Sequence, residues 1–211
     1  MRVDSVVLAL GVLSSVGCAG GIDAARFSED ACRSLELPAL GSFVLPEPVD
    51  FVEIRYLFDP GTAGDKRGMS FGTPCKDATT PECEQQLATT ESTTGWPAGR
   101  YRRSYLLITR GETVSLVNTL EGLRDWLGSI DNAAEAIFLA AAELDGKIVC
   151  QRYSTPVNNV LATSSGWELY LETGSGCGDE AFDRRVYVSK DGEVEILESD
   201  RIADDNDFCG G

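Results

Sequence analysis

Residues 107–150 read LITRGETVSLVNTLEGLRDWLGSIDNAAEAIFLAAAELDGKIVC, and this stretch decides the fold. It opens inside a predicted hairpin, in which strands 105–109 and 113–118 are joined by the turn Arg110-Gly111-Glu112. An amphipathic helix is expected next, because apolar residues recur at helical spacing before a glycine that ends the helix. These residues are Leu120, Leu123, Trp126, Leu127 and Gly128, and we expect Trp126 to be a core anchor.

A second amphipathic helix follows and carries a capping signal. Asp131 or Asn132 is the predicted N-cap, and the spacing from Asn132 to Glu135 fits a capping box. Gly146 ends the helix. A wide apolar face predicts that this helix is buried against a sheet, and the face consists of Ala136, Ile137, Leu139, Ala140 and Leu144.

Outward from this stretch the sequence predicts strands. Residues 51–58, FVEIRYLF, are rich in β-branched and aromatic side chains. An antiparallel meander with the hairpin turn Lys190-Asp191-Gly192 is predicted after Gly146, with strands at 147–153, 158–163, 167–172, 184–189 and 193–197. The expected fold class is therefore α+β, an antiparallel sheet with about two amphipathic helices on one face. We expect residues 32–211 to form a single domain.

The composition excludes several classes of function. The 211 residues carry a net charge of −16, which repels nucleic-acid phosphate and anionic lipid. The chain has no histidine, which excludes Ser-His-Asp and Cys-His catalysis as well as histidine-ligated metal. It contains no glycine motif for phosphate binding, so nothing indicates a nucleotide. We therefore predict no catalytic residue, no metal site and no cofactor.

The N-terminus has the pattern of an export signal. Residues 1–17 combine Arg2 with an apolar run that is too short to span a bilayer well. The run ends in Ser15-Val16-Gly17-Cys18, which resembles the lipobox of bacterial lipoproteins. In that family the cysteine thiol is acylated and the peptide bond before it is cut, so the resemblance implies that residues 1–17 are a signal peptide.

The lipobox resemblance also implies a location. Cys18 would be the lipid attachment residue and a lipid bilayer its partner. Ala19 follows where an aspartate commonly means inner-membrane retention, which implies the outer membrane of a Gram-negative cell. Residues 18–31 are small and polar, so we expect a lipidated tether there. The alternative is an ordinary cleaved signal with Cys18 in a disulfide.

The remaining cysteines predict a disulfide framework. Seven cysteines less the lipidated one leave six, an even number, which in an oxidising compartment indicates three disulfides. We expect the pairs to be Cys75–Cys83 as a local clip, Cys150–Cys177 between neighbouring strands, and Cys32–Cys209 between the termini. Sequence alone leaves other pairings open. A metal site is the alternative, but CxxC pairs and histidines are absent.

The middle of the chain resembles a group of bacterial lipoproteins in which a domain of this kind precedes a ferritin-like domain. The resemblance rests on Thr109-Arg110-Gly111, Leu127-Gly128-Ser129-Ile130-Asp131, the alanine-rich helix and Cys150. Later segments also fit, namely Gly166-Trp167-Glu168, Cys177, Asp191-Gly192-Glu193-Val194 and Cys209. The resemblance implies fold and location rather than activity. Iron chemistry is not implied, because the sequence has no Glu-x-x-His motif.

Two charged segments are candidate binding sites. Residues 59–104 are the least regular part of the chain, apart from a short helix predicted at 82–89, and their end carries a dense basic patch of Arg100, Arg102 and Arg103. This patch is either a solvated loop that pairs with surplus acids or an anion site. The acidic end is either solvated or a calcium site without EF-hand spacing, and consists of Glu198, Asp200, Asp204, Asp205, Asn206 and Asp207.

These observations favour a non-enzymatic role. We expect a cell-envelope lipoprotein whose domain is an interaction or structural module, with an envelope protein as candidate partner. Two alternatives stay open, namely a histidine-free envelope hydrolase that uses two carboxylates on glycan, and a weak cation-binding domain. With 34 Asp and Glu residues, the sequence cannot place two carboxylates across a cleft.

Overall fold

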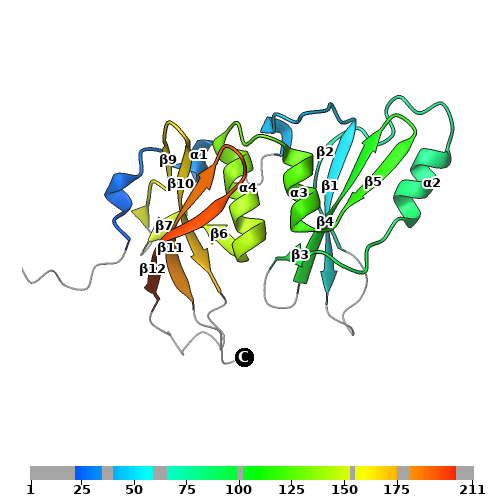
Figure 1. The fold of residues 1–211 in the computed structure, drawn as a ribbon. Helices are drawn as coiled ribbons and strands as arrows, with labels where there is room; N and C mark the ends of the chain where they lie inside the picture. The colour runs from blue at the N-terminus through cyan, green and yellow to red at the C-terminus, as the bar shows by residue number, and fades with distance from the viewer. Residues whose placement is uncertain are drawn as a thin grey trace, which may run out of the picture.

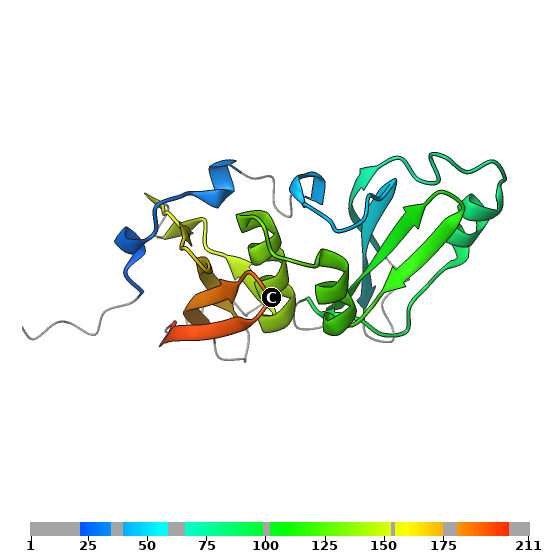
Figure 2. The same ribbon diagram turned by 45° about the horizontal axis from the view of Figure 1, so that its top comes forward.

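The computed structural model describes residues 22–34, 40–58, 66–98, 102–152, 155–174 and 181–202. It confirms the α+β fold class, with antiparallel pairing throughout the described strands. The strands divide into two sheets rather than one, and the two predicted amphipathic helices lie between them (Figures 1 and 2). The two helices therefore lie in one hydrophobic core that includes side chains of both sheets.

The first sheet has the strand order β2-β1-β4-β3, and β5 pairs with a different part of β4 than β3 does. Residues 51–58 are strand β1, as predicted, and the predicted hairpin is β4 and β5. The sheet comprises β1 (Phe51–Phe58), β2 (Lys66–Gly72), β3 (Trp96–Pro97), β4 (Arg102–Arg110) and β5 (Thr113–Val117). Val52, Ile54, Leu106 and Ile108 point from β1 and β4 into the core.

The second sheet has the strand order β12-β11-β10-β6, with β9 also paired to β10. The long meander strands agree with the prediction, but 147–153 divides into β6 and β7, and β7 pairs with β8 in a separate ribbon. The bounds are β6 (Gly146–Ile148), β7 (Gln151–Arg152), β8 (Thr155–Pro156), β9 (Val160–Ala162), β10 (Gly166–Thr173), β11 (Phe182–Ser189) and β12 (Val194–Arg201).

Helices α3 (Leu120–Leu127) and α4 (Ala133–Leu144) are the two predicted amphipathic helices, and the C-cap of α4 is Asp145, one residue before the predicted Gly146. The Thr119 hydroxyl accepts a hydrogen bond from the Gly122 N–H at 3.0 Å, and Gly128 closes α3 with φ +68°. Asn132 and Glu135 form the predicted capping box of α4. One continuous core of buried side chains joins both helices to both sheets, and Trp126 belongs to it.

The outer face of the first sheet is covered by helix α2 (Glu82–Thr89), the short helix predicted from sequence. The disulfide Cys75–Cys83 clips its first turn, as predicted. The Arg55 guanidinium holds its last turn, because Nη2 donates to the Leu87 carbonyl at 3.1 Å and Nη1 to the Thr90 carbonyl at 3.0 Å. A cation is favourable at this end of a helix.

The outer face of the second sheet is covered by the N-terminal segment, and this corrects the predicted tether. Phe27 is 2 % exposed and stacks on Tyr170 with ring centroids 5.8 Å apart. The N–H groups of Ser28 and Glu29 both donate to the Val160 carbonyl at 3.0 Å. Residues 22–31 are therefore part of the folded domain. The buried ring of Phe27 and the backbone hydrogen bonds to Val160 hold this segment on the sheet although most of its side chains are small or polar. This segment includes the short turns Ala24–Arg26 and α1 (Ala31–Ser34).

The second disulfide joins Cys32 to Cys150, across 118 residues of sequence. The predicted pairs Cys32–Cys209 and Cys150–Cys177 are therefore wrong, because the N-terminal segment lies against the strands that carry Cys150 rather than against the C-terminal end. Asn159 supports this bridge: its side-chain amide donates to the Val149 carbonyl at 3.0 Å, and its oxygen accepts from the Ala31 N–H at 2.9 Å. Cys18, Cys177 and Cys209 lie outside the described residues.

Candidate functional site

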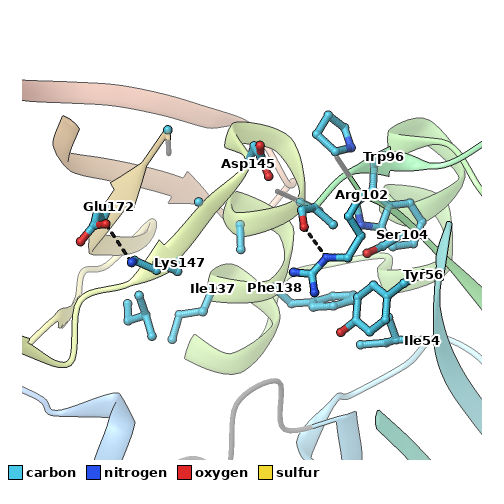
Figure 3. Close-up of a pocket in the computed structure, with 17 residues that line it drawn as sticks. Ile54, Tyr56, Trp96, Arg102, Ser104, Ile137, Phe138, Asp145, Lys147 and Glu172 are labelled. Atoms are coloured by element: carbon cyan, nitrogen blue, oxygen red, sulfur yellow. Dashed lines mark hydrogen bonds and ion pairs between the residues drawn. The ribbon is translucent and has the colours of Figure 1, made fainter. Parts of the chain in front are cut away.

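A pocket of about 440 Å³ opens between the two sheets, along the C-terminal half of α4 (Figure 3). The volume lies in the range of small-molecule sites, roughly 300–1,000 Å³. Its walls come from β1, β3 and β4 on one side and from β6 and β10 on the other. β3 and β6 are the end strands of their sheets on this side and contribute only two and three residues, which leaves α4 uncovered between them.

The floor of the pocket is apolar. Helix α4 presents Ile137, Phe138 and the small side chains Ala141 and Ala142. Phe138 packs edge-on against Trp96 with ring centroids 6.5 Å apart. Because alanine side chains are short, the helix surface is hollowed where a larger residue would fill the space. The alanine-rich sequence of α4 thus both packs the core and creates the cavity.

The wall from the first sheet presents one cation and two aromatic rings. Tyr56 and Arg102 lie on neighbouring strands and share the face that points toward α4. The Arg102 guanidinium carbon lies 4.5 Å above the Tyr56 ring centroid, within cation–π range. Its Nε donates to the Ala98 carbonyl at 2.6 Å. The Arg102 side chain is exposed, and its two terminal amino groups make no hydrogen bond to the described residues.

On the side of the second sheet, the pocket is lined by an ion pair of a lysine and a glutamate. Lys147 Nζ lies 2.8 Å from Glu172 Oε1, on cross-strand partners of β6 and β10. Asp145 lines the same part of the pocket, where it ends α4 in the left-handed region with φ +51°. Figure 3 shows Arg102 and the Lys147–Glu172 pair at opposite ends, with Ile137 and Phe138 between them. The pocket is thus apolar in the middle and charged at both ends.

The predicted basic patch divides between the pocket and the opposite face. Arg102 lines the pocket, whereas Arg103 is the next residue of β4, is exposed and does not line it. Arg100 lies outside the described residues. Sequence reasoning missed Tyr56, Lys147 and Glu172 as pocket residues, because nothing in a sequence shows that segments so far apart meet.

Two of the three buried carboxylates among the described residues, Glu53 and Glu135, are engaged in structural bonds, and the third, Asp183, accepts a hydrogen bond from the Tyr170 hydroxyl at 3.0 Å. Glu53 pairs with Arg55 at 2.7 Å beneath α2. Glu135 accepts from the Asp131 N–H at 2.6 Å and from the Val44 N–H, so it joins the segment before β1 to the start of α4. These partners leave neither carboxylate available for catalysis.

The predicted acidic end is only partly within the described residues. Glu198 Oε2 accepts from Arg185 Nε at 3.1 Å, so it is already paired on the second sheet. Residues 204–207 lie outside the described residues. Within the described ranges, no group of three or more acidic or cysteine side chains is placed to hold a metal ion. The calcium alternative therefore stays a prediction from sequence.

One exposed carboxylate has a perturbed pKa, at the tip of the β4–β5 hairpin. The Thr79 N–H and hydroxyl donate to Glu112 Oε1 at 2.6 and 2.8 Å, and the Thr80 hydroxyl donates to Oε2 at 2.8 Å. The hydrogen bonds from Thr79 and Thr80 lower the pKa of Glu112 below its usual value. They tie the hairpin tip to the turn that precedes α2, so the group is structural.

No protein-family model, curated protein or solved structure matches this chain. The two disulfides indicate folding in an oxidising, non-cytoplasmic compartment. None of the helices in the described part of the chain has the length and apolar character needed to cross a bilayer.

Proposed function

We propose that this chain is a cell-envelope lipoprotein whose folded domain is a non-enzymatic binding module, with the pocket between the two sheets as its binding site. The pocket supports this proposal best, because an apolar floor with a few fixed charges is the usual form of a small-molecule site. Ser104 and Tyr56 are the hydroxyl groups at the pocket, and among the described residues neither hydrogen-bonds a basic side chain that would activate it.

The anchor is the second part of the proposal. Acylation of Cys18 would attach the chain to the outer membrane, and several acyl chains together would make the attachment stable. The packing of the N-terminal segment limits the distance between Cys18 and the folded domain. Ile22 is buried against the second sheet, so the chain from Cys18 to Ile22 spans at most about 14 Å. The outer face of that sheet would then lie close to the lipid headgroups.

The anchor is tested by mass spectrometry of the mature, non-reduced protein and by a Cys18→Ser variant. We expect a lipid-modified N-terminal cysteine and membrane-fraction protein for the natural chain, and soluble protein for the variant. A mature chain that retains residues 1–17, or an unmodified Cys18, contradicts this part of the proposal.

The binding site is tested by native mass spectrometry of the full chain purified from envelopes. We expect a bound small molecule in the natural protein and none in Ala141→Phe, which places a ring in the hollow of α4. Ala88→Phe is the matched control, because Ala88 is an exposed alanine on helix α2. A natural protein that carries no small molecule, or an Ala141→Phe variant that keeps it, contradicts the assignment of this site.

A second function is favoured by one observation, that Asp145 and Glu172 both line the pocket. Two carboxylates across a cleft are the requirement for a histidine-free glycosidase. Against this, Glu172 is already paired with Lys147, whose Nζ lies 2.8 Å from Glu172 Oε1. Hydrolysis of envelope glycan that is lost in both Asp145→Asn and Glu172→Gln would establish the enzyme and replace the binding module.

A further inference from the structure

Arg102 lines the pocket and has no carboxylate partner among the described residues. In the described part of the chain its interactions are the Ala98 carbonyl, at 2.6 Å from Nε, and the Tyr56 ring, 4.5 Å from the guanidinium carbon. Arg55, Arg110, Arg124 and Arg185 each pair with a glutamate instead. The terminal amino groups of Arg102 form a planar fork suited to a carboxylate.

The opposite end of the pocket does not supply that carboxylate. Glu172 is compensated by Lys147 at 2.8 Å, and Figure 3 shows both beyond Ile137 and Phe138 from Arg102. Asp145 ends α4 and has interactions of its own. A ligand that extends from Arg102 along α4 would therefore contact three kinds of group in turn. The first is the guanidinium of Arg102, the second is the apolar surface of α4, and the third is the Lys147–Glu172 ion pair.

From this arrangement we infer that the pocket binds a small aliphatic carboxylate, with its carboxylate on the Arg102 fork and its hydrocarbon chain along Ile137 and Phe138. The inference rests on the proposed function of the pocket as a binding site. A single negative charge suits the site better than a phosphate, because a second charge would be repelled by the Asp145 carboxylate and by the net charge of −16. A cationic ligand would meet Arg102 unfavourably.

Three probes of matched chain length separate charge from hydrophobicity: octanoate, octanol and octylammonium. Isothermal titration calorimetry with the full-length protein measures each affinity. We expect octanoate to bind about tenfold more tightly than octanol, the ratio that a partly exposed charge-assisted hydrogen bond typically supplies. Octylammonium is expected to bind more weakly than octanol.

Variants at two adjacent arginines assign the charge effect to one residue. Arg102→Gln should lower octanoate affinity about tenfold, to the level of octanol, and leave octanol affinity unchanged. Arg103→Gln is the matched control, because it removes the same charge from the same strand but from the face that points away from the pocket. It should leave all three affinities within about twofold, because Arg103 does not line the pocket.

The outcomes separate this inference from the proposed function. If octanol and octanoate bind equally and Ala141→Phe abolishes both, the pocket is a binding site but the carboxylate is wrong. If octylammonium binds most tightly, the acids Asp145 and Glu172 dominate and the inference is overturned. If none of the three probes binds the natural protein, both the ligand class and the evidence for a small-molecule site in this pocket are lost.

Discussion

The buried pair of Glu53 and Arg55 should be a main determinant of stability. Their side chains are only 6 % and 5 % exposed, and the Nε–Oε2 distance is 2.7 Å. The change to test is Arg55→Met, which keeps most of the aliphatic volume and removes the charge. Glu53 is then left with Arg67, whose Nε lies 3.8 Å away on a side chain that is 70 % exposed.

The expected loss of unfolding free energy arises because the Glu53 carboxylate stays buried without its partner. Removing one partner of a buried ion pair typically costs about 3–5 kcal/mol, because the other charge stays uncompensated. The carbonyls of Leu87 and Thr90 also lose their donors, so the last turn of α2 is released from the sheet. For a domain of this size that loss corresponds to a fall in melting temperature of roughly 6–20 °C.

Urea unfolding of the oxidised full chain, followed by tryptophan fluorescence, measures the difference. Arg67→Met is the matched control, and should cost less than about 1 kcal/mol because its ion pair is exposed on one side. If Arg55→Met does not fold, Arg55→Lys provides the measurement, since lysine keeps the positive charge but lacks the planar guanidinium that bonds the Leu87 and Thr90 carbonyls. The double variant Glu53→Leu/Arg55→Met should recover part of the loss, because no charge stays buried. A cost below about 1 kcal/mol for both Arg55 variants would refute the reasoning.

Three further measurements test other parts of the structure. Asn159→Ala should cost about 3 kcal/mol in urea unfolding, because it leaves buried backbone groups without partners, whereas a similar loss in the exposed Asn158→Ala would show that burial is not the cause. The stabilisation from Glu112 should be present above its ordinary pKa of about 4.5 and disappear as the pH falls through its lower folded value, so the hydrogen-exchange protection factor of the Thr79 N–H should fall in acid and lose this pH dependence in Glu112→Gln. Peptide mapping of the non-reduced protein should recover Cys32 linked to Cys150, and a Cys150–Cys177 peptide in its place would show the described bridge to be wrong.

The local elements could be predicted from the sequence because their signals are local. Asn132 and Glu135 sit at capping-box spacing, and Gly128 takes a positive φ that favours glycine, so both helix boundaries follow from neighbouring residues. Strand β1 and the β4–β5 hairpin likewise follow from composition and turn chemistry. Strand β2 was missed, because KRGMSFG contains two glycines and exposes Met69 and Phe71.

The division into two sheets could not be predicted from the sequence. The alternation of apolar and polar side chains shows that a residue lies in a strand, but it does not show which other strand pairs with that one. The same limit explains the disulfide error. The predicted Cys32–Cys209 pair ties the two termini together, whereas Phe27 packs on Tyr170 and places Cys32 beside Cys150. A single aromatic residue in a small polar segment was the signal that the sequence contained.

The position of the pocket follows from how the two sheets are closed. Each outer face is covered by a segment that a disulfide and a buried polar side chain hold in place: Cys75–Cys83 with Arg55 on one sheet, and Cys32–Cys150 with Asn159 on the other. On the inner side, the end strands β3 and β6 are the parts of the two sheets that border the pocket. Because those strands are short and α4 presents alanines between them, the unfilled volume lies there, where Arg102 is fixed from one sheet and Lys147 from the other. A ligand in that space would contact both sheets at once, so binding should stabilise their packing against α4.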